Sequence, residues 1–453
     1  MAHSHEALVY GRIGLRGNPR MIGPVVSLGV LRSATSEPTV STEGNDPEGT
    51  RRQAKRGLLS GLSFLGRVLI LGAGGVIGFL IVSLAVGASV ASHSSLFAME
   101  AAAMWTTFGP HLTLAALAIV LLGAWGWHRR PQRLSRVVSV IGAVALAASG
   151  LVTTQIVVAA WGAGGQVNPI SALGLSSMNA PADASVTYQV IGGQSLSAVI
   201  YRPKGPVGAA PVLMYIHGGG WFAGDATDEG HDMRWLADGG WLVVSVNYRL
   251  ATPSHPTWDE APRDVACALV WTQLNAGRWG GDPNRLVVAG DSAGGNLAVN
   301  LSYGAALGRA KSDCGGQVPV PIGVVVQYPV VDPQSAYADG FPVPGMEPQK
   351  FIERYLGGAP QQFPERMAAI SSATYISSQA PPTLIIEPER DGLIPTAGVV
   401  RFAEQASADG VDVTVELIPF ANHAYDQGAA SSLGNQARLT ITKNYLDRLL
   451  ARN

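Results

Sequence analysis

A serine flanked by glycines is the residue of this chain best suited to nucleophilic chemistry. The segment RLVVAGDSAGGNLA contains the pattern Gly-x-Ser-x-Gly, with Ser292 at its centre. The apolar residues 285–290 predict a strand and the residues from Gly294 onward predict a helix, so the serine lies in a strand–turn–helix context. Glycine at both flanks suits a sharp turn in which a Cβ would clash. Because the same pattern occurs in plain turns and in phosphate-binding loops, it needs support from other residues.

A run of glycines upstream gives that support. The motif HGGGW, residues 217–221, directly follows the apolar segment VLMYI. Consecutive glycines leave backbone N–H groups unobstructed, as an oxyanion hole requires. We expect Gly218 and Gly219 to be its donors, with the N–H of Ala293 as the third. His217 is expected to order the glycine loop rather than to transfer protons, and a flexible hinge is the alternative interpretation of the motif.

A nucleophilic serine also needs a base, and the base needs an acid that orients it. Among nine histidines, only His423 follows a late predicted strand in a short loop near the C-terminus, so we expect it to be the general base. In one known chain order of such triads the acid lies between serine and histidine. Asp391, after the apolar segment PTLIIE, is the expected acid. Glu389 and Asp332 are its rivals, and a surface-loop histidine and a turn aspartate are the plainer interpretations.

The elements that must position these residues follow an alternating pattern between residues 182 and 453. Near-continuous apolar runs predict strands buried on both faces, at residues 212–216, 241–246, 285–290, 322–328 and 382–387. Helix-like segments lie between or after them, at residues 258–276, 294–308, 348–355 and 396–409. Residues 185–190 and 196–201 suggest an antiparallel hairpin at an edge. The alternation predicts an α/β domain with a mostly parallel sheet and helices on both faces.

The N-terminal part of the chain predicts a membrane region. Only 14% of all residues are charged, and no Asp, Glu, Lys or Arg occurs in residues 68–99 or 137–182. Three apolar stretches, residues 68–91, 104–127 and 137–161, are long enough to cross a bilayer as helices, which takes about 20 residues. Core helices of a soluble domain are the alternative, which would demand an unusually large core.

Basic residues predict the orientation of these spans. They lie before the first span and between the second and third, at Arg51, Arg52, Lys55, Arg56, Arg67, Arg129, Arg130, Arg133 and Arg136. The predicted organisation is a disordered cytoplasmic tail (1–65), a three-helix membrane region of the plasma or inner membrane (66–163), a linker (164–181) and an extracytoplasmic domain (182–453).

The net charge and the cysteine content limit which classes of partner and cofactor are expected. A net charge of -1 gives no basic excess for nucleic acid. The chain has two cysteines, Cys267 and Cys314, which could form a disulfide outside the cytoplasm; otherwise Cys267 is a small buried hydrophobe. No residue spacing indicates a metal site or a nucleotide fold, so no metal and no cofactor are expected.

Taken together, the motifs resemble one family. HGGGW, YRLATPSHPTWDEAPRDV, GGDPNRLVVAGDSAGGNLA, PPTLIIEPERDGLIP and NHAYD are similar to the hormone-sensitive-lipase-like and acetylesterase (feruloyl-esterase-like) carboxylesterase branch of the α/β-hydrolase superfamily, over residues 185–450. The resemblance implies an α/β-hydrolase fold with about eight strands and metal-independent ester hydrolysis. It implies catalytic roles for Ser292, Asp391 and His423, oxyanion roles for Gly218, Gly219 and Ala293, and structural roles for Tyr248, Arg249 and Asp264.

Three features depart from the family, and one of them is that Pro388-Glu389-Arg390 replaces the glycine that precedes the acid in many relatives. Its soluble members often carry an N-terminal helical cap over the pocket, whereas here only a short linker follows the third span. Residues 329–375 form a long insertion that could serve as lid and acyl pocket, or simply pack on the surface. The sequence assigns no substrate-binding residue and no protein partner.

The resulting hypothesis is a membrane-anchored serine carboxylesterase that cleaves small to medium acyl esters, carried by small molecules or lipids, through an acyl-enzyme. A peptidase or amidase on the same fold is one alternative, because the triad does not choose between ester and amide. A non-catalytic, hydrolase-like binding ectodomain is the other.

Overall fold

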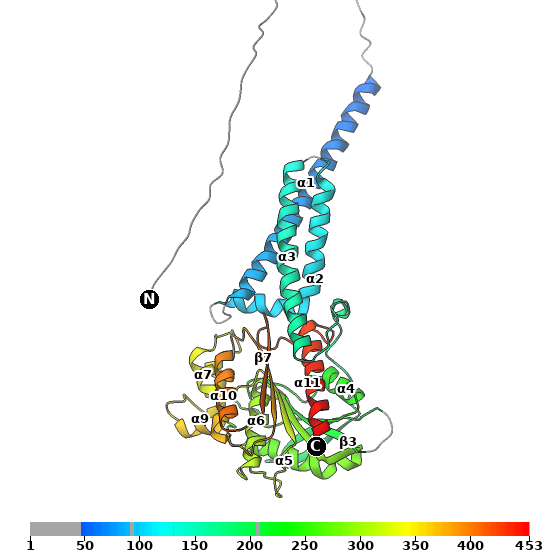
Figure 1. Ribbon diagram of the computed structural model, residues 1–453. Helices are drawn as coiled ribbons and strands as arrows, with labels where there is room; N and C mark the ends of the chain where they lie inside the picture. The colour runs from blue at the N-terminus through cyan, green and yellow to red at the C-terminus, as the bar shows by residue number, and fades with distance from the viewer. Residues whose placement is uncertain (1–46, 91–94, 130, 205–208, 453) are drawn as a thin grey trace, which may run out of the picture. The chain divides into compact units, whose positions relative to one another are not determined.

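A single mixed sheet forms the centre of the C-terminal domain in the computed structural model, which describes residues 47–90, 95–129, 131–204 and 209–452. Its eight strands lie in the order β1-β2-β4-β3-β5-β6-β7-β8 (Figure 1). The strands from β4 to β8 run parallel, and β1 and β2 pair antiparallel at one edge. Their bounds are β1 Ala184–Ile191, β2 Gln194–Tyr201, β3 Ala210–Ile216, β4 Leu242–Val246, β5 Gly281–Asp291, β6 Gly323–Gln327, β7 Thr383–Pro388 and β8 Val413–Ile418. This is the predicted α/β-hydrolase sheet.

Burial along the strands explains why near-continuous apolar runs fold in this way. Every residue of β4, β6 and β7 is buried, whereas the edge strand β1 alternates between covered and exposed positions. The turn between β1 and β2 places Gly192 and Gly193 at φ 54° and 80°, a conformation that glycine adopts without strain and that suits a tight hairpin. The predicted edge hairpin is therefore confirmed.

Helices cover both faces of the sheet. Alternate residues of β3 contribute to two separate cores, because Val212 and Met214 face one side and Leu213 the other. The helices are α4 Gly230–Asp238, α5 Ala261–Asn275, α6 Ser292–Ala306, α7 Pro333–Asp339, α8 Pro348–Leu356, α9 Pro364–Ile370, α10 Thr396–Ala408 and α11 Leu433–Arg452, with short 3-10 turns η2 Ser171–Gly174, η3 Ala276–Trp279 and η4 Ser372–Tyr375. Buried residues of α5, α6 and α10 join the first core, and those of α4 and α11 join the second.

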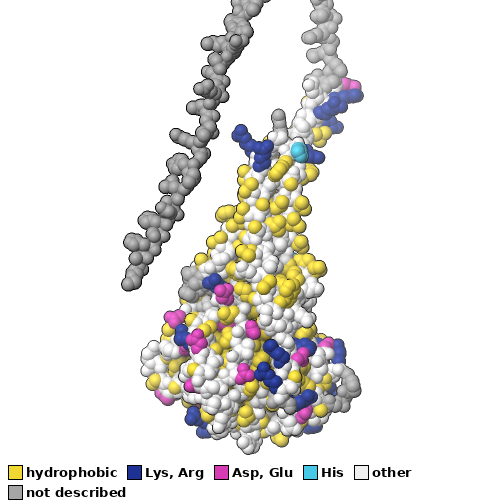
Figure 2. All heavy atoms as spheres, in the orientation of Figure 1, with side chains coloured by type: hydrophobic (Ala, Val, Ile, Leu, Met, Phe, Trp, Pro, Cys, Tyr) yellow, Lys and Arg dark blue, Asp and Glu magenta, His cyan; other side chains and the backbone are white. Residues whose placement is uncertain are grey.

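Three helices before the sheet are long and apolar enough to span a membrane: α1 Pro47–Ser89, α2 Leu96–Gly126 and α3 Gln132–Gly162. Apolar side chains occupy much of the visible surface of these helices, and Lys and Arg lie at one end (Figure 2). Helices α2 and α3 approach closely through small residues, since a Cβ on Gly123 would lie 2.4 Å from the Ser139 Oγ. Small residues at such contacts are typical of helices that pack within a bilayer.

The predicted disordered tail is too long. Residues 1–46 lie outside the described part, but α1 begins at Pro47, so the tail prediction for residues 47–65 is wrong. Good helix formers such as Arg, Lys, Ala and Leu make up about half of this segment, although it also contains three glycines. An ion pair between Glu48 and Arg52, one turn apart at 3.6 Å, adds local support.

The linker is attached to the C-terminal helix rather than loose. The N–H of Gln166 donates to the Thr440 Oγ1 at 2.8 Å, and that of Asn168 donates to the Gln436 Oε1 at 2.7 Å. Because both acceptors belong to α11, the linker connects α3 to the hydrolase core along a defined path.

Candidate active site

The turn between β5 and α6 has the geometry of a nucleophile elbow. Ser292 has φ 50°, in the left-handed region that non-glycine residues seldom adopt. A Cβ on Gly294 would lie 2.1 Å from the Ile216 carbonyl oxygen, and one on Gly290 would lie 2.6 Å from the Gly294 oxygen. Both glycines are therefore required by close backbone approach, and the strained turn lifts the serine above the sheet.

The structure brings the three predicted catalytic residues together. The Nε2 of His423 lies 3.0 Å from the Ser292 Oγ, and its Nδ1 lies 2.7 Å from the Asp391 Oδ2. The other oxygen of Asp391 accepts hydrogen bonds from the N–H groups of Leu393 and Ile394, at 2.9 and 2.8 Å. These bonds fix the carboxylate, so the imidazole can keep its Nδ1 proton toward Asp391 and offer Nε2 to the serine.

The two rival acids have other partners. Asp332 accepts from the Ser335 N–H at 3.0 Å, which caps α7, and pairs with Arg401 at 3.0 Å. Glu389 lies 3.7 Å from the Arg390 guanidinium. Neither supplies the carboxylate that bonds to His423.

The glycine loop is ordered as expected, but one of its predicted donors is occupied. The Gly218 N–H donates to the Asp291 Oδ1 at 2.8 Å, so it is engaged in holding the loop. His217 is buried, donates from Nδ1 to the Gly218 carbonyl at 2.8 Å and stacks on Tyr248 at 4.5 Å. Gly219, with φ 101° and a Cβ position only 2.3 Å from the Ala223 oxygen, must be glycine.

Which N–H groups form the oxyanion hole stays a prediction. With the Gly218 N–H occupied, Gly219 and Ala293 remain as the predicted donors. Ala293 is the second residue of α6, where a helix has no internal acceptor for the N–H. Gly220, at φ 58°, is a further candidate that the sequence did not single out among the three glycines.

A buried network of charged residues is connected to Asp291, the residue that holds the glycine loop. Arg438 on α11 pairs with three carboxylates, those of Glu229, Asp232 and Asp426, and its guanidinium lies 3.3 Å from the Tyr215 hydroxyl. That hydroxyl donates to Asp291 at 2.6 Å. Burial raises the pKa of Asp426 to about 6, although Arg438 opposes the shift. Sequence reasoning missed this network because its members are far apart and no motif contains them.

The first turn of α2 also contacts the catalytic loops. The side-chain amide of Asn422 donates to the Met99 carbonyl at 3.2 Å, while its oxygen accepts from the Gly392 N–H at 2.9 Å. A Cβ on Gly392 would lie 3.1 Å from the Met99 sulfur. The first turn of α2 therefore borders the catalytic loops, which was not expected from the sequence. No signal in the sequence distinguishes Met99 from other apolar residues of the predicted membrane region.

The insertion packs against the glycine loop. Its helices α7, α8 and α9 include Tyr355, which stacks on Trp221 at 4.4 Å, and Phe351, 5.9 Å from the same ring. A cavity of about 250 Å³ lies between Phe222 and α8, lined also by Arg354. The role of residues 329–375 as lid and acyl pocket stays a prediction.

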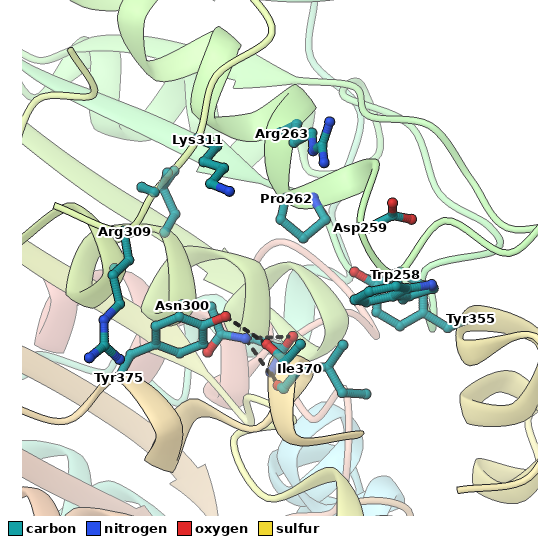
Figure 3. A pocket seen from close by; sticks show the side chains of 15 residues that line it. Trp258, Asp259, Pro262, Arg263, Asn300, Arg309, Lys311, Tyr355, Ile370 and Tyr375 are labelled. Atoms are coloured by element: carbon teal, nitrogen blue, oxygen red, sulfur yellow. Dashed lines mark hydrogen bonds between the residues drawn. The ribbon is translucent and has the colours of Figure 1, made fainter. Parts of the chain in front are cut away.

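A separate cavity of about 160 Å³ lies between α5, α6 and residues 369–375 (Figure 3). Arg263, Arg309 and Lys311 give its rim positive charge, and Arg263 pairs with Asp313 at 3.5 Å. None of Ser292, Asp391 and His423 lines it. It is therefore not part of the candidate active site.

The two cysteines form a disulfide between α5 and the loop after α6, with Cα atoms 5.2 Å apart. The bridge closes a loop with a sequence separation of 47, for which chain-entropy arguments give about 4 kcal/mol. We expect the variant Cys267→Ala/Cys314→Ser to lose about that much free energy of unfolding, measured by urea titration in detergent. Reductant should lower wild-type stability to the same level and leave the variant unchanged; equal sensitivity of both proteins would contradict the prediction.

Glu387 predicts a pH dependence of stability. Its carboxyl is fully buried at the end of β7, and burial together with the charge of Asp391 raises its pKa well above the ordinary 4.5. The unfolded chain ionises above about pH 4.5 while the folded chain stays protonated, so wild-type stability falls with rising pH relative to Glu387→Gln, by up to about 1.4 kcal/mol per pH unit.

Apparent melting temperatures from pH 4 to 8 measure this difference. The gap between Glu387→Gln and wild type should widen as the pH rises, whereas the exposed Glu404→Gln on α10 should follow wild type throughout. A gap that does not vary with pH would show that Glu387 is not held protonated.

Comparisons with known proteins find similarity to esterases. The family model described as BD-FAE matches residues 199–405. A probable carboxylic ester hydrolase of Mycobacterium tuberculosis, LipM, is 30% identical over 257 residues, which cover 54% of this chain and 56% of the relative. The ethyl acetate hydrolase of Pseudomonas putida is 29% identical over 246 residues, 51% of this chain and 72% of that protein.

Solved structures support the fold. The apo form of Thermogutta terrifontis esterase 2 has a TM-score of 0.50 at 21% identity, and the match covers 59% of this chain and 95% of that one. LipM and its sister esterase LipQ are matched over 56% and 58% of their length, so this chain spans somewhat more than half of these relatives. The chain therefore has the α/β-hydrolase fold, and its sequence is similar to that of carboxylic ester hydrolases.

Proposed function

We propose that this chain is a serine carboxylesterase, anchored to a membrane by its three long helices, that cleaves acyl esters through an acyl-enzyme. The observation that carries the proposal is the continuous relay from Ser292 to His423 to Asp391, with 3.0 Å and 2.7 Å between the bonded atoms. Relatives with esterase names, such as LipM, are consistent with it.

The proposed reaction has two acyl-transfer steps. The Ser292 Oγ attacks the ester carbonyl while its proton passes to the His423 Nε2, and the oxyanion is stabilised by the N–H groups of Gly219 and Ala293. The C–O bond to the alcohol then breaks, and the alcohol leaves with the proton from His423. Water attacks the acyl-enzyme with His423 again as base, which releases the acid and restores the serine. Asp391 orients the ring and stabilises the imidazolium.

The hydrolase domain is proposed to lie on the extracytoplasmic face. Basic residues between α2 and α3, including Arg129, Arg133 and Arg136, favour the cytoplasm for that connection. The disulfide between Cys267 and Cys314 fits an oxidising compartment. Protease added to intact cells should remove a C-terminal tag, and protection of the tag would reverse the orientation.

The activity is tested on the full chain in detergent micelles. A fluorophosphonate probe should label wild type but not Ser292→Ala, and p-nitrophenyl esters from acetate to decanoate should be cleaved faster than aminoacyl p-nitroanilides. Ser302→Ala, a buried serine of the same helix, is the matched control and should be labelled like wild type. Anilide turnover above ester turnover would indicate a peptidase or amidase, and absence of labelling in wild type would indicate a binding domain.

A further inference from the structure

The membrane helices meet the hydrolase domain at the edge that carries the catalytic loops. Gly392 follows Asp391, Asn422 precedes His423, and both contact Met99 on α2. Further along the same helix, Thr107 lies against Gly428, where an added Cβ would be 2.0 Å from its Oγ1. Strands β7 and β8 end at Pro388 and Ile418, shortly before these loops, so α2 contacts loops at the carboxyl ends of the strands.

The length of α2 indicates how far this edge lies from the hydrocarbon layer. The helix has 31 residues, about 46 Å, whereas the hydrocarbon takes about 20 residues and 30 Å. Trp125 and Trp127 mark its distal end, where Arg129 lies 4.7 Å from the Trp125 ring centroid. Twenty residues from there reach about Phe108. The segment 96–107 therefore extends into and beyond the headgroup layer.

The length of α3 and the position of one acidic residue lead to the same estimate of where the hydrocarbon layer ends. The Thr153 hydroxyl of α3 lies 3.3 Å from that of Thr113, so the two helices are level there. Counting about 20 residues from Arg136 ends near Ile156, just past this level. Glu100, exposed on the first turns of α2, is the one acidic residue between 68 and 182, and a carboxylate is costly in hydrocarbon. Met99 lies nine residues beyond Phe108 along α2, or about 13 Å, so Met99 and the catalytic loops lie at the outer side of the headgroup layer.

Exposed apolar side chains lie at the start of α2, at the end of α3 and in the segment that follows α3. We define the apolar collar as Leu96, Phe97, Trp161, Ile170 and Leu175, which belong to the start of α2, the end of α3 and the linker. Ile170 is 78% exposed and Phe97 54% exposed. Large apolar side chains gathered next to a membrane span are stabilised by insertion between lipids. The collar would hold the catalytic edge against the bilayer.

We propose that the substrate is an ester carried by a membrane lipid, which reaches Ser292 from the headgroup layer beside the first turn of α2 rather than from bulk water. This inference rests on the proposed esterase activity and names its substrate class. A lipid ester group lies close to the headgroup boundary, on the side of the bilayer that faces the catalytic loops.

The test uses the full chain in phosphatidylcholine nanodiscs with two substrates, dioleoylglycerol in the bilayer and water-soluble p-nitrophenyl acetate. Collar variants Leu96→Asp and Ile170→Asp should each lower dioleoylglycerol turnover about tenfold, because an apolar side chain is replaced by a charge at the lipid surface. Turnover of p-nitrophenyl acetate should stay within about twofold. Aspartate at position 96 also suits a helix N-terminus, so α2 should remain folded.

Leu274→Asp is the matched control, since Leu274 is 75% exposed on α5, distant in sequence from the collar, and should change neither rate. Equal loss on both substrates, or no loss on either, would overturn the lipid proposal. Wild type that is labelled by fluorophosphonate and cleaves the acetate but not dioleoylglycerol would also overturn it while leaving the esterase proposal intact. Wild type inactive on both and unlabelled would remove the esterase proposal itself.

Discussion

Replacing Asp391 by asparagine is expected to lower kcat/KM for ester substrates about 10⁴-fold at neutral pH. The asparagine oxygen can still accept from the Leu393 and Ile394 N–H groups, which turns its NH₂ toward the His423 Nδ1. That nitrogen must then accept, so the ring carries its proton on Nε2 and cannot take one from Ser292. Ester turnover by the full chain in micelles measures the loss.

Asp332→Asn is the control for this prediction, because Asp332 was the rival acid and instead caps α7. It should keep kcat/KM within about threefold of wild type while slightly lowering stability. If Asp332→Asn proved as damaging as Asp391→Asn, or if Asp391→Asn retained activity, the assignment of the acid would be wrong.

Arg438→Met is expected to lower the free energy of unfolding by about 3–5 kcal/mol. The substitution leaves the carboxylates of Glu229, Asp232 and Asp426 buried without their cation. Burial already raises the pKa of Glu229, so loss of Arg438 should force further protonation. Urea unfolding followed by tryptophan fluorescence measures the change.

Arg448→Met provides the comparison, since Arg448 is exposed on the same helix and should change stability by less than about 0.5 kcal/mol. Destabilisation by Arg438→Met should also diminish as the pH falls toward 5, because protonation neutralises the unpaired carboxylates. An effect no larger than that of Arg448→Met would mean that the network contributes little.

Much of the fold could be predicted because its information is local. Strands covered on both faces need apolar residues at every position, and β4, β6 and β7 are buried along their whole length. The sharp turn at Ser292 could be predicted from Gly290 and Gly294, where an added Cβ would clash with backbone. Chain order then pointed to Asp391 and His423.

Contacts between distant segments could not be predicted in this way. The occupation of the Gly218 N–H by Asp291 depends on how two loops meet, and the pairing of Arg438 joins α11 to acids about 200 residues earlier. The bond from Asn422 to Met99 spans 323 residues. Polar residues of these kinds occur throughout the chain, so nothing in their type or spacing marks them.

The contact at Met99 bears on how the enzyme should be handled. A fragment that starts after α3 would lack the acceptor of the Asn422 amide and would expose the buried Gly392 to water. The loops that bear Asp391 and His423 would then be free to shift, and a shift of about 1 Å can cost about two orders of magnitude in rate. Rate constants measured on such a fragment would be those of a protein with displaced catalytic loops. They would be lower than the rate constants of the full chain.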